Sequence, residues 1–182
     1  MYPKVLLKIA RDAIKEQLTA QKLIDKQYLT KEYPFLLKNG AVFVTLNKNR
    51  DLRGCIGSLV SHRTLIDDVI YNAKAAAFDD VRFLPLSQEE FDQIEIEVSV
   101  LSEPEKVSYS SIEELKSLIV PYKDGIILRH QNRQATFLPQ VWEQLPEFDI
   151  FFAHLGQKAG LGADVLEHNP EIYKYRVDSY SE

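Results

Sequence analysis

The sequence predicts an α+β fold, with a mostly antiparallel sheet flanked by helices and two lobes in one domain. Apolar stripes with the period of a helix are interspersed with short apolar runs that read as hairpins. They do not follow the regular strand–helix–strand alternation of a parallel sheet. The 182 residues are enough for one domain with a sizeable core, and no repeat or linker divides them. We therefore expect a single domain over residues 1–182.

The amino-acid composition limits the functional classes to which the protein can belong. Hydrophobic residues make up 45% and charged residues 27%, as in ordinary globular proteins. A net charge of -5 argues against non-specific nucleic-acid binding, which needs basic residues to neutralise phosphates. The single cysteine forbids an intrachain disulfide and suits a reducing compartment. Without an apolar leader or an apolar run of about 18 residues, we expect a cytoplasmic protein with no membrane partner.

The first half of the chain begins with a predicted amphipathic helix, because apolar residues recur at helical spacing from Val5 to Leu18. Residues 41–46 form a short run of apolar, largely β-branched residues, which indicates a buried strand. Residues 47–51 are polar and read as a turn, and 52–59 read as the returning strand. Together these segments predict a hairpin.

Helix caps and alternation define the next elements. Thr64 with Asp67 predicts the start of an alanine-rich helix, and Ser87 with Glu90 predicts a shorter one. Residues 94–101 then alternate apolar and polar side chains. This pattern is typical of a strand with one solvated face.

The second half repeats these signals. Ser111 with Glu114 opens a predicted helix of about two turns. Residues 125–138 contain two short runs around a polar turn and predict a second hairpin. Pro139 suits the first turn of a helix, and the phenylalanine-rich stripe that follows stops at a predicted C-cap, Gly160. Residues 172–177 are the last predicted strand.

The segment 52–57, Leu-Arg-Gly-Cys-Ile-Gly, holds the only thiol of the chain between two glycines. Glycine inside a strand marks a bulge, a bend or the close approach of another group. Strict alternation would put Arg53 and Cys55 on one face, about 7 Å apart. A guanidinium close to a thiol favours the nucleophilic thiolate. The alternative interpretation is that Cys55 is a small buried hydrophobic residue.

A nucleophilic cysteine needs a general base, and the sequence offers no obvious one. None of the four histidines stands at a characteristic spacing from Cys55. No cluster with metal-ligand spacing is present, so no metal site is predicted. Phosphate-loop, dinucleotide and nucleophile-elbow motifs are also missing from the sequence. The sequence therefore identifies no cofactor.

Three further groups of charged or polar residues have structural interpretations, and two of these groups have a functional interpretation as well. Asp80 and Arg82 follow the alanine-rich helix, either as a surface ion pair of small energy or as a loop that brings both charges to a cleft. Lys158 stands near a predicted helix end, where a cation complements the helix dipole. The polar face of the strand at residues 94–101 carries Glu95, Glu97 and Ser99. This face is either simply exposed to solvent or lines a cleft in which the carboxylates act as acid–base groups.

The order of several motifs along the chain resembles the AMMECR domain family over nearly the whole length. The segment 52–57, called the LRGCIG segment below, is the hallmark of that family. The other motifs are Val42-Phe43-Val44-Thr45-Leu46, Ala75-Ala76-Ala77-Phe78, Asp80 with Arg82-Phe83, Ile96-Glu97-Val98-Ser99-Val100-Leu101, Lys123-Asp124-Gly125-Ile126, Thr136-Phe137-Leu138-Pro139-Gln140-Val141 and Lys158-Ala159-Gly160-Leu161.

This resemblance implies a two-lobed α+β fold with the LRGCIG segment near a cleft between the lobes, and it implies no particular substrate. Prokaryotic members are encoded beside a Memo-like protein and a radical SAM protein, which are therefore expected partners. Val81 stands where the family usually has proline. By position, the resemblance assigns these site residues: Arg53, Gly54, Cys55, Gly57, Asp80, Arg82, Gln140 and Lys158.

Two functional hypotheses follow. In the favoured one, the chain is a module that binds a small molecule or a partner protein and works with Memo-like and radical SAM proteins. In the alternative, the chain is an enzyme that uses Cys55 as a nucleophile or carrier thiol. Arg53 would then lower the thiol pKa or bind an anion, and Asp80, Arg82 and Lys158 would position the substrate. The sequence leaves open whether the protein is an enzyme.

Overall fold

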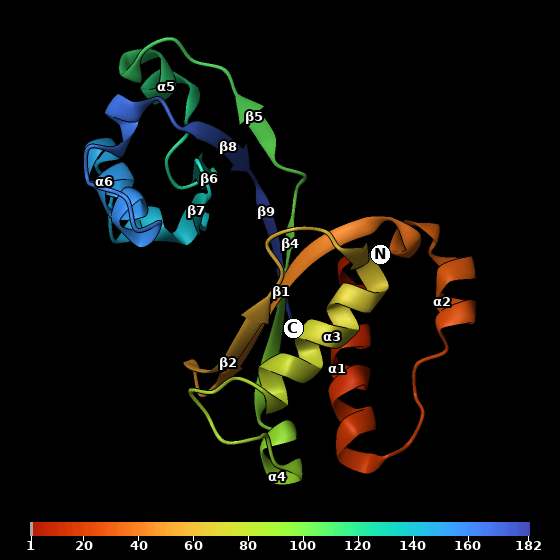
Figure 1. Cartoon of the computed structure of the whole chain (residues 1–182). Coiled ribbons are helices and arrows are strands. Elements are labelled where there is room, and N and C mark those ends of the chain that lie inside the picture. Colours follow the sequence, from red (N-terminus) through yellow and green to blue (C-terminus); the bar gives the residue numbers. More distant parts are fainter. Residues whose placement is uncertain (1) are drawn as a thin grey trace. The chain divides into compact units, whose positions relative to one another are not determined.

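The computed structural model describes residues 2–182, and within them the chain divides into two compact units. The first unit contains Met1–Leu101 and Asp178–Glu182, and the second contains Ser102–Val177 (Figure 1). Both units combine helices with antiparallel strands, so the predicted α+β class is confirmed. That the whole chain acts as one domain stays a prediction. No helix of the described chain is both long and apolar enough to cross a bilayer.

The first unit is built on a five-stranded sheet with the order β2-β1-β4-β9, in which the short β3 also pairs with β1. Its strands are β1 (Asn39–Lys48), β2 (Asp51–Gly57), β3 (Arg63–Thr64), β4 (Ile94–Leu101) and β9 (Val177–Ser181). Its helices are α1 (Tyr2–Thr19), α2 (Lys26–Glu32), the 3-10 helix η1 (Pro34–Leu37), α3 (Leu65–Phe78) and α4 (Gln88–Phe91). The sheet ends at β2, which is therefore an edge strand.

Helices α1 and α3 lie side by side and bury one face of this sheet (Figure 1). Val42, Val44 and Leu46 point from β1 into the core, and Ile96 and Val98 point there from β4. The residues between them, such as Thr45 and Glu97, therefore face the opposite side of the sheet.

The predicted hairpin of β1 and β2 is confirmed, with one irregularity. Asn49 and Arg50 have positive φ angles of 54° and 70°, as a two-residue hairpin turn requires. Leu46 pairs with Gly54, but Asn47 pairs with Leu52. Arg53 is thus an extra residue in β2, a β-bulge that interrupts the alternation of side chains.

Both predicted caps of the first unit are confirmed. The Thr64 side chain accepts the N–H of Asp67 at the start of α3. Ser87 and Glu90 form a complete capping box at α4, each side chain accepting a backbone N–H of the other residue. Local sequence therefore determines where these helices begin.

The second unit contains a four-stranded antiparallel sheet with the order β5-β8-β6-β7. Its strands are β5 (Glu105–Val107), β6 (Gly125–His130), β7 (Arg133–Phe137) and β8 (Glu171–Tyr175). Its helices are α5 (Ile112–Leu118), α6 (Phe148–Lys158) and the 3-10 helices η2 (Pro139–Glu143) and η3 (Val165–His168). The predicted second hairpin is confirmed as β6 and β7.

Aromatic packing fixes α6 on this second sheet. The Trp142 ring stacks on Phe151 with centroids 3.6 Å apart, and its Nε1–H donates to the Asp124 carbonyl at 2.9 Å. The helix stops where predicted, because Gly160 has a φ of 70° that favours glycine.

The last predicted strand, residues 172–177, is wrong in extent. It is split into β8, which ends at Tyr175, and β9, which begins at Val177 and joins the other sheet. Arg176 lies between them, with its N–H bound to the Ser102 hydroxyl and its guanidinium to Asp124. These long-range contacts end the strand, and they leave no trace in the local sequence.

Gly54 and Gly57 allow close packing on either side of β2. A Cβ on Gly54 would lie 2.1 Å from the carbonyl oxygen of Ala76 in α3. A Cβ on Gly57 would lie 2.2 Å from the ring of Phe43. Any side chain at Gly54 would have to displace helix backbone, because no flexible group is there to give way.

We expect Gly54→Ala to lower the free energy of unfolding by about 1–3 kcal/mol, the cost typical of overpacking a core. Urea denaturation of the purified protein measures it. Gly40→Ala is the matched control, because its Cβ would meet the end of the Leu65 side chain at 2.8 Å, which can move. Equal stability of the two variants would contradict the proposed contact with α3.

Candidate functional site

Arg53 is bound on the core side of the sheet. Its Nε donates to Glu90 Oε1 at 3.1 Å, and its Nη2 donates to Glu90 Oε2 at 2.9 Å and to the Leu84 carbonyl at 2.8 Å. Lys48, which has the same orientation in β1 as Leu46, also donates to Glu90 at 3.2 Å. The expectation that Arg53 shares a face with Cys55 is therefore wrong, because the bulge turns Arg53 toward α4.

The Arg53–Glu90 pair is partly buried, with the arginine side chain only 12% exposed. Hydrogen bonds from Arg53 lower the pKa of Glu90 to about 2; burial opposes this shift and Lys48 adds to it. Glu90 is thus ionised at neutral pH. One guanidinium nitrogen, Nη1, is buried without a hydrogen-bond partner among the described residues.

Cys55 is half-buried, and its side chain and main chain have different partners. Its Sγ lies 3.3 Å from the hydroxyl of Thr45, the residue opposite it on β1. Its backbone N–H donates to Asp80 Oδ2 at 2.9 Å, and its carbonyl accepts from Arg82 Nη2 at 3.3 Å. Two side chains thus take the place that a further strand would occupy at the edge of β2.

Asp80 and Arg82 form more than an isolated surface ion pair. Asp80 is 5% exposed and accepts from Arg82 Nη2 at 2.7 Å, from Arg82 Nε at 2.9 Å and from two backbone N–H groups. These hydrogen bonds, chiefly those from the Arg82 side chain, hold the pKa of Asp80 well below its usual range although burial acts against them. The same pairing raises the pKa of Arg82. The Asp80 carboxylate therefore has a structural role, because its hydrogen bonds attach the loop after α3 to β2.

A row of polar side chains crosses the sheet on the face opposite α1 and α3. Thr45 stands opposite Glu97 of β4, and Glu97 accepts hydrogen bonds from Ser99 at 3.3 Å and from Ser181 of β9 at 3.2 Å. With Cys55 at one end, this row reaches across four strands. Ser99 is 4% exposed, so the predicted solvated face of β4 is only partly solvated.

A buried polar network connects α3 to the start of β1. Asp68 accepts the Val42 N–H at 2.8 Å and the Ser58 hydroxyl at 2.7 Å, and Asn72 donates to the Val42 carbonyl at 3.1 Å. Arg63 approaches Asp68 at 3.6 Å. Sequence reasoning missed this network. The available signal was a polar pair spaced i, i+4 on an otherwise apolar helix stripe.

Gln140 and Lys158 belong to the second unit, whereas the other candidate residues belong to the first. Gln140 is exposed on η2. Lys158 is exposed at the end of α6, where its Nζ donates to the Thr136 carbonyl at 2.9 Å and lies 5.0 Å from the Phe137 ring. Lys158 thereby ties α6 to β7, which is a sufficient structural reason for a cation there.

The contacts of Cys55 within the described chain include no histidine. His62 is exposed after β2, and His130, His154 and His168 belong to the second unit. Among residues 2–182, no group of three or more histidine, cysteine or acidic side chains is arranged to hold a metal ion. The geometry at Cys55 therefore presents a thiol beside a hydroxyl, with no imidazole base in contact.

Comparisons with known proteins place this α+β chain in a family. Residues 7–180 match the AMMECR1 family model, and the chain belongs to that family. A relative from Thermofilum pendens is 35% identical over 194 residues, covering 98% of this chain and 88% of the relative. One from Methanothermobacter thermautotrophicus is 38% identical over 178 residues, covering 97% and 91%.

The family is also represented among solved structures. The crystal structure of the uncharacterized protein PH0010 from Pyrococcus horikoshii matches with a TM-score of 0.82 and 33% sequence identity. The match covers 100% of this chain and 91% of that one. The resemblance inferred from the LRGCIG segment and the motifs around it is thus confirmed at the level of the family.

The Arg53–Glu90 pair predicts a pH dependence. Folding lowers the pKa of Glu90 from 4.5 to about 2. The ionised Glu90 carboxylate therefore contributes its full share to the free energy of unfolding above pH 4.5, and this share is lost as the pH falls toward 2. We expect this contribution to the free energy of unfolding to be on the order of 2 kcal/mol, after allowing for solvent screening of the Glu90 side chain, which is 25% exposed.

Urea denaturation of Glu90→Gln between about pH 2 and pH 7 measures this contribution. The difference in unfolding free energy from the unsubstituted protein is expected to shrink as the pH falls. Glu89→Gln is the matched control, because Glu89 is exposed on the same helix. A constant difference over the whole pH range would mean that the ion pair does not stabilise the fold.

Proposed function

We propose that this chain is a non-catalytic binding module that docks a partner protein beside the LRGCIG segment. The observation that carries the proposal is the loop of residues 79–87, which presents Val81 at 98% exposure and Leu84 at 83% exposure. Val81 and Leu84 stand three positions apart in one short loop, and exposed apolar side chains that form a continuous patch mark interaction sites.

The 79–87 loop is held in place at several points. Asp80 and Arg82 bind the main chain of Cys55, and Arg53 binds the Leu84 carbonyl. The N–H of Leu86 donates to the Ala77 carbonyl at 2.8 Å. Because the loop is already ordered, a partner would lose little of its binding energy in ordering it.

The charged groups around the loop are consistent with the same role. The Phe83 ring lies 5.7 Å from the Arg53 guanidinium and 5.5 Å from that of Arg82, which is about half exposed. An apolar contact surrounded by arginine is the composition that protein interfaces favour. The LRGCIG segment thus supports a docking loop in this proposal, and its residues need no contact with a substrate.

Memo-like and radical SAM proteins are the partners that we propose, on the strength of the gene neighbourhood typical of prokaryotic members of the family. Both would be tested as purified proteins encoded in the genome from which this chain comes. The competing hypothesis is that the LRGCIG segment binds a small molecule instead of a protein. In that case we expect neither purified protein to bind.

We expect Val81→Asp and Leu84→Asp each to weaken binding of the partner at least tenfold, because a charge would replace an apolar side chain that the partner buries in the complex. Isothermal titration calorimetry against each purified candidate measures the effect. Tyr28→Asp is the control, because Tyr28 is 61% exposed on α2, away from the loop. Equal affinity of the loop variants and the control would rule out the loop as the docking site.

A second candidate function uses the thiol. It is favoured by one observation: Cys55 is only half-buried, and its Sγ lies 3.3 Å from the Thr45 hydroxyl. As a nucleophile or carrier thiol, Cys55 would work from the polar face of the sheet. Its own N–H is bound by Asp80, so this donor is not available for an oxyanion, and Arg53 is bound by Glu90.

The rate of alkylation by iodoacetamide separates the two functions. For a binding module we expect Cys55 to react no faster in the folded protein than in denaturant, and partner binding to be unchanged in Cys55→Ser. Thr45→Val, which removes the hydroxyl next to the thiol, serves as the comparison. Alkylation that is faster in the folded protein than in denaturant, and that slows in Thr45→Val, would support thiol chemistry instead.

A further inference from the structure

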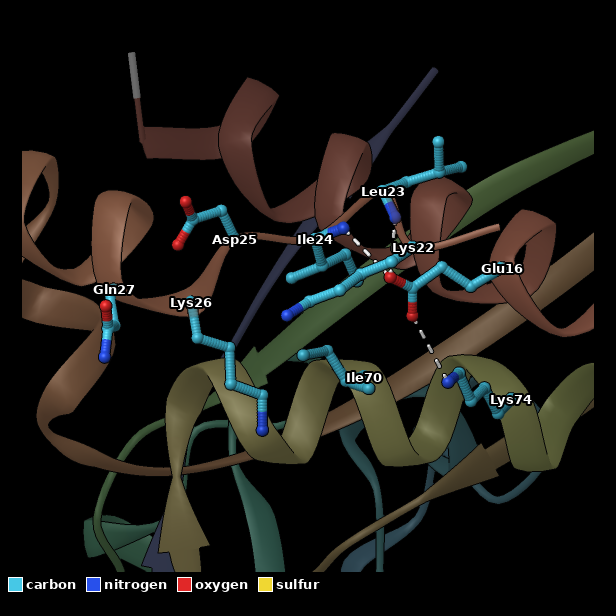
Figure 2. Close-up of a pocket in the computed structure, with 9 residues that line it drawn as sticks. All are labelled: Glu16, Lys22, Leu23, Ile24, Asp25, Lys26, Gln27, Ile70 and Lys74. Carbon is cyan, nitrogen blue, oxygen red and sulfur yellow. Dashed lines mark hydrogen bonds and ion pairs between the residues drawn. The ribbon is translucent and has the colours of Figure 1, made fainter. Parts of the chain in front are cut away.

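A cavity of about 910 Å³ lies in the first unit, and no residue of the LRGCIG segment lines it (Figure 2). One wall is formed by residues 22–27, which comprise the end of the α1–α2 connection and the first two residues of α2. Glu16 of α1 and Ile70 and Lys74 of α3 complete the lining. This volume falls within the range of cavities that hold small organic ligands. Nothing in the proposed docking role uses this cavity.

Three lysines line the cavity, and they differ in how they are paired. Lys26 forms an ion pair with Asp67, and Lys74 approaches Glu16 at 3.5 Å. Lys22 has no hydrogen-bond or ion-pair partner among residues 2–182. Figure 2 shows the side chain of Lys22 extending into the space between its own segment and α3. Lys22 is exposed to solvent, so its ammonium group is free to pair with an anion that enters the cavity.

The two acidic residues of the lining are already engaged by backbone donors. Glu16 Oε1 accepts the N–H groups of Leu23 at 2.8 Å and Ile24 at 2.9 Å. Burial alone would raise the pKa of Glu16, but these hydrogen bonds and Lys74 lower it overall, so that it stays ionised. Asp25 accepts the Tyr28 N–H at 3.0 Å as the N-cap of α2. Neither carboxylate forms an ion pair or a hydrogen bond with Lys22 among the described residues.

Apolar side chains complement the lysines. Ile24 is 6% exposed and Ile70 is half-buried, and both line the same cavity. A ligand that fits has an anionic group and a less polar body. Lys74 lines the same cavity and approaches Glu16 at 3.5 Å; together with Lys22 it supplies positive charge for an anionic group in the cavity. Phosphate is such a group, and lysine binds it as a point charge.

We propose that this cavity binds a phosphate-bearing organic molecule the size of a nucleotide. The phosphate contacts the ammonium groups of Lys22 and Lys74, and the organic part packs on Ile24 and Ile70. Lys26 keeps its pairing with Asp67. The site is independent of the docking loop, so its failure would leave the proposed function untouched.

Calorimetric titration of the whole chain with AMP, adenosine and inorganic phosphate tests the proposal. We expect AMP to bind with a Kd below about 1 mM, and adenosine and inorganic phosphate to bind at least tenfold more weakly, since each lacks one half of the ligand. Raising the salt concentration is expected to weaken AMP binding.

Lys22→Glu is the decisive variant, because the substitution removes no hydrogen bond or ion pair that the described residues form. It is expected to weaken AMP binding at least tenfold, and Lys74→Gln to weaken it less. Lys31→Glu is the control, with the same charge change on the exposed side of α2. The proposal is overturned if AMP gives no saturable binding, if AMP binds no more tightly than adenosine or phosphate, or if Lys22→Glu binds like Lys31→Glu.

Discussion

The free edge of β2 at Cys55 is the constraint on which much of the first unit depends. An edge strand presents N–H and C=O groups that need partners, and here the side chains of Asp80 and Arg82 bind both main-chain groups of Cys55. The loop after α3 is thereby joined to the sheet. On its other side, β2 packs against α3 through Gly54, so the strand is held between the helix and the loop that follows that helix.

This arrangement changes how the LRGCIG segment is understood. As a linear motif it suggests a reactive cysteine activated by its arginine. In three dimensions Arg53 binds Glu90, Gly54 contacts α3, and Gly57 makes room for Phe43. Each has a structural task in building the edge of the sheet. Cys55 is only partly exposed, whereas Val81 and Leu84 of the 79–87 loop are largely exposed, which is why we favour docking over catalysis.

The predictions that held rest on interactions between residues close in sequence. Thr64 with Asp67 and Ser87 with Glu90 cap their helices as expected, because both partners lie within one turn. The site was less predictable. The bulge at Arg53 depends on the register between two strands, and the network of Asp68 and Asn72 depends on where α3 meets β1. In neither case are the interacting residues adjacent in the chain.

The sequence by itself determined the family, the α+β class, the caps and the hairpins, since periodicity and capping are local properties of the chain. Only the tertiary structure decided which way Arg53 points, which groups Asp80 holds, and that the last strand divides between two sheets. It also brought Lys22 and Lys74, from separate elements, to one cavity. The physical reason is the same in each case: these features are set by register and by contacts between segments distant in sequence, which no local pattern encodes.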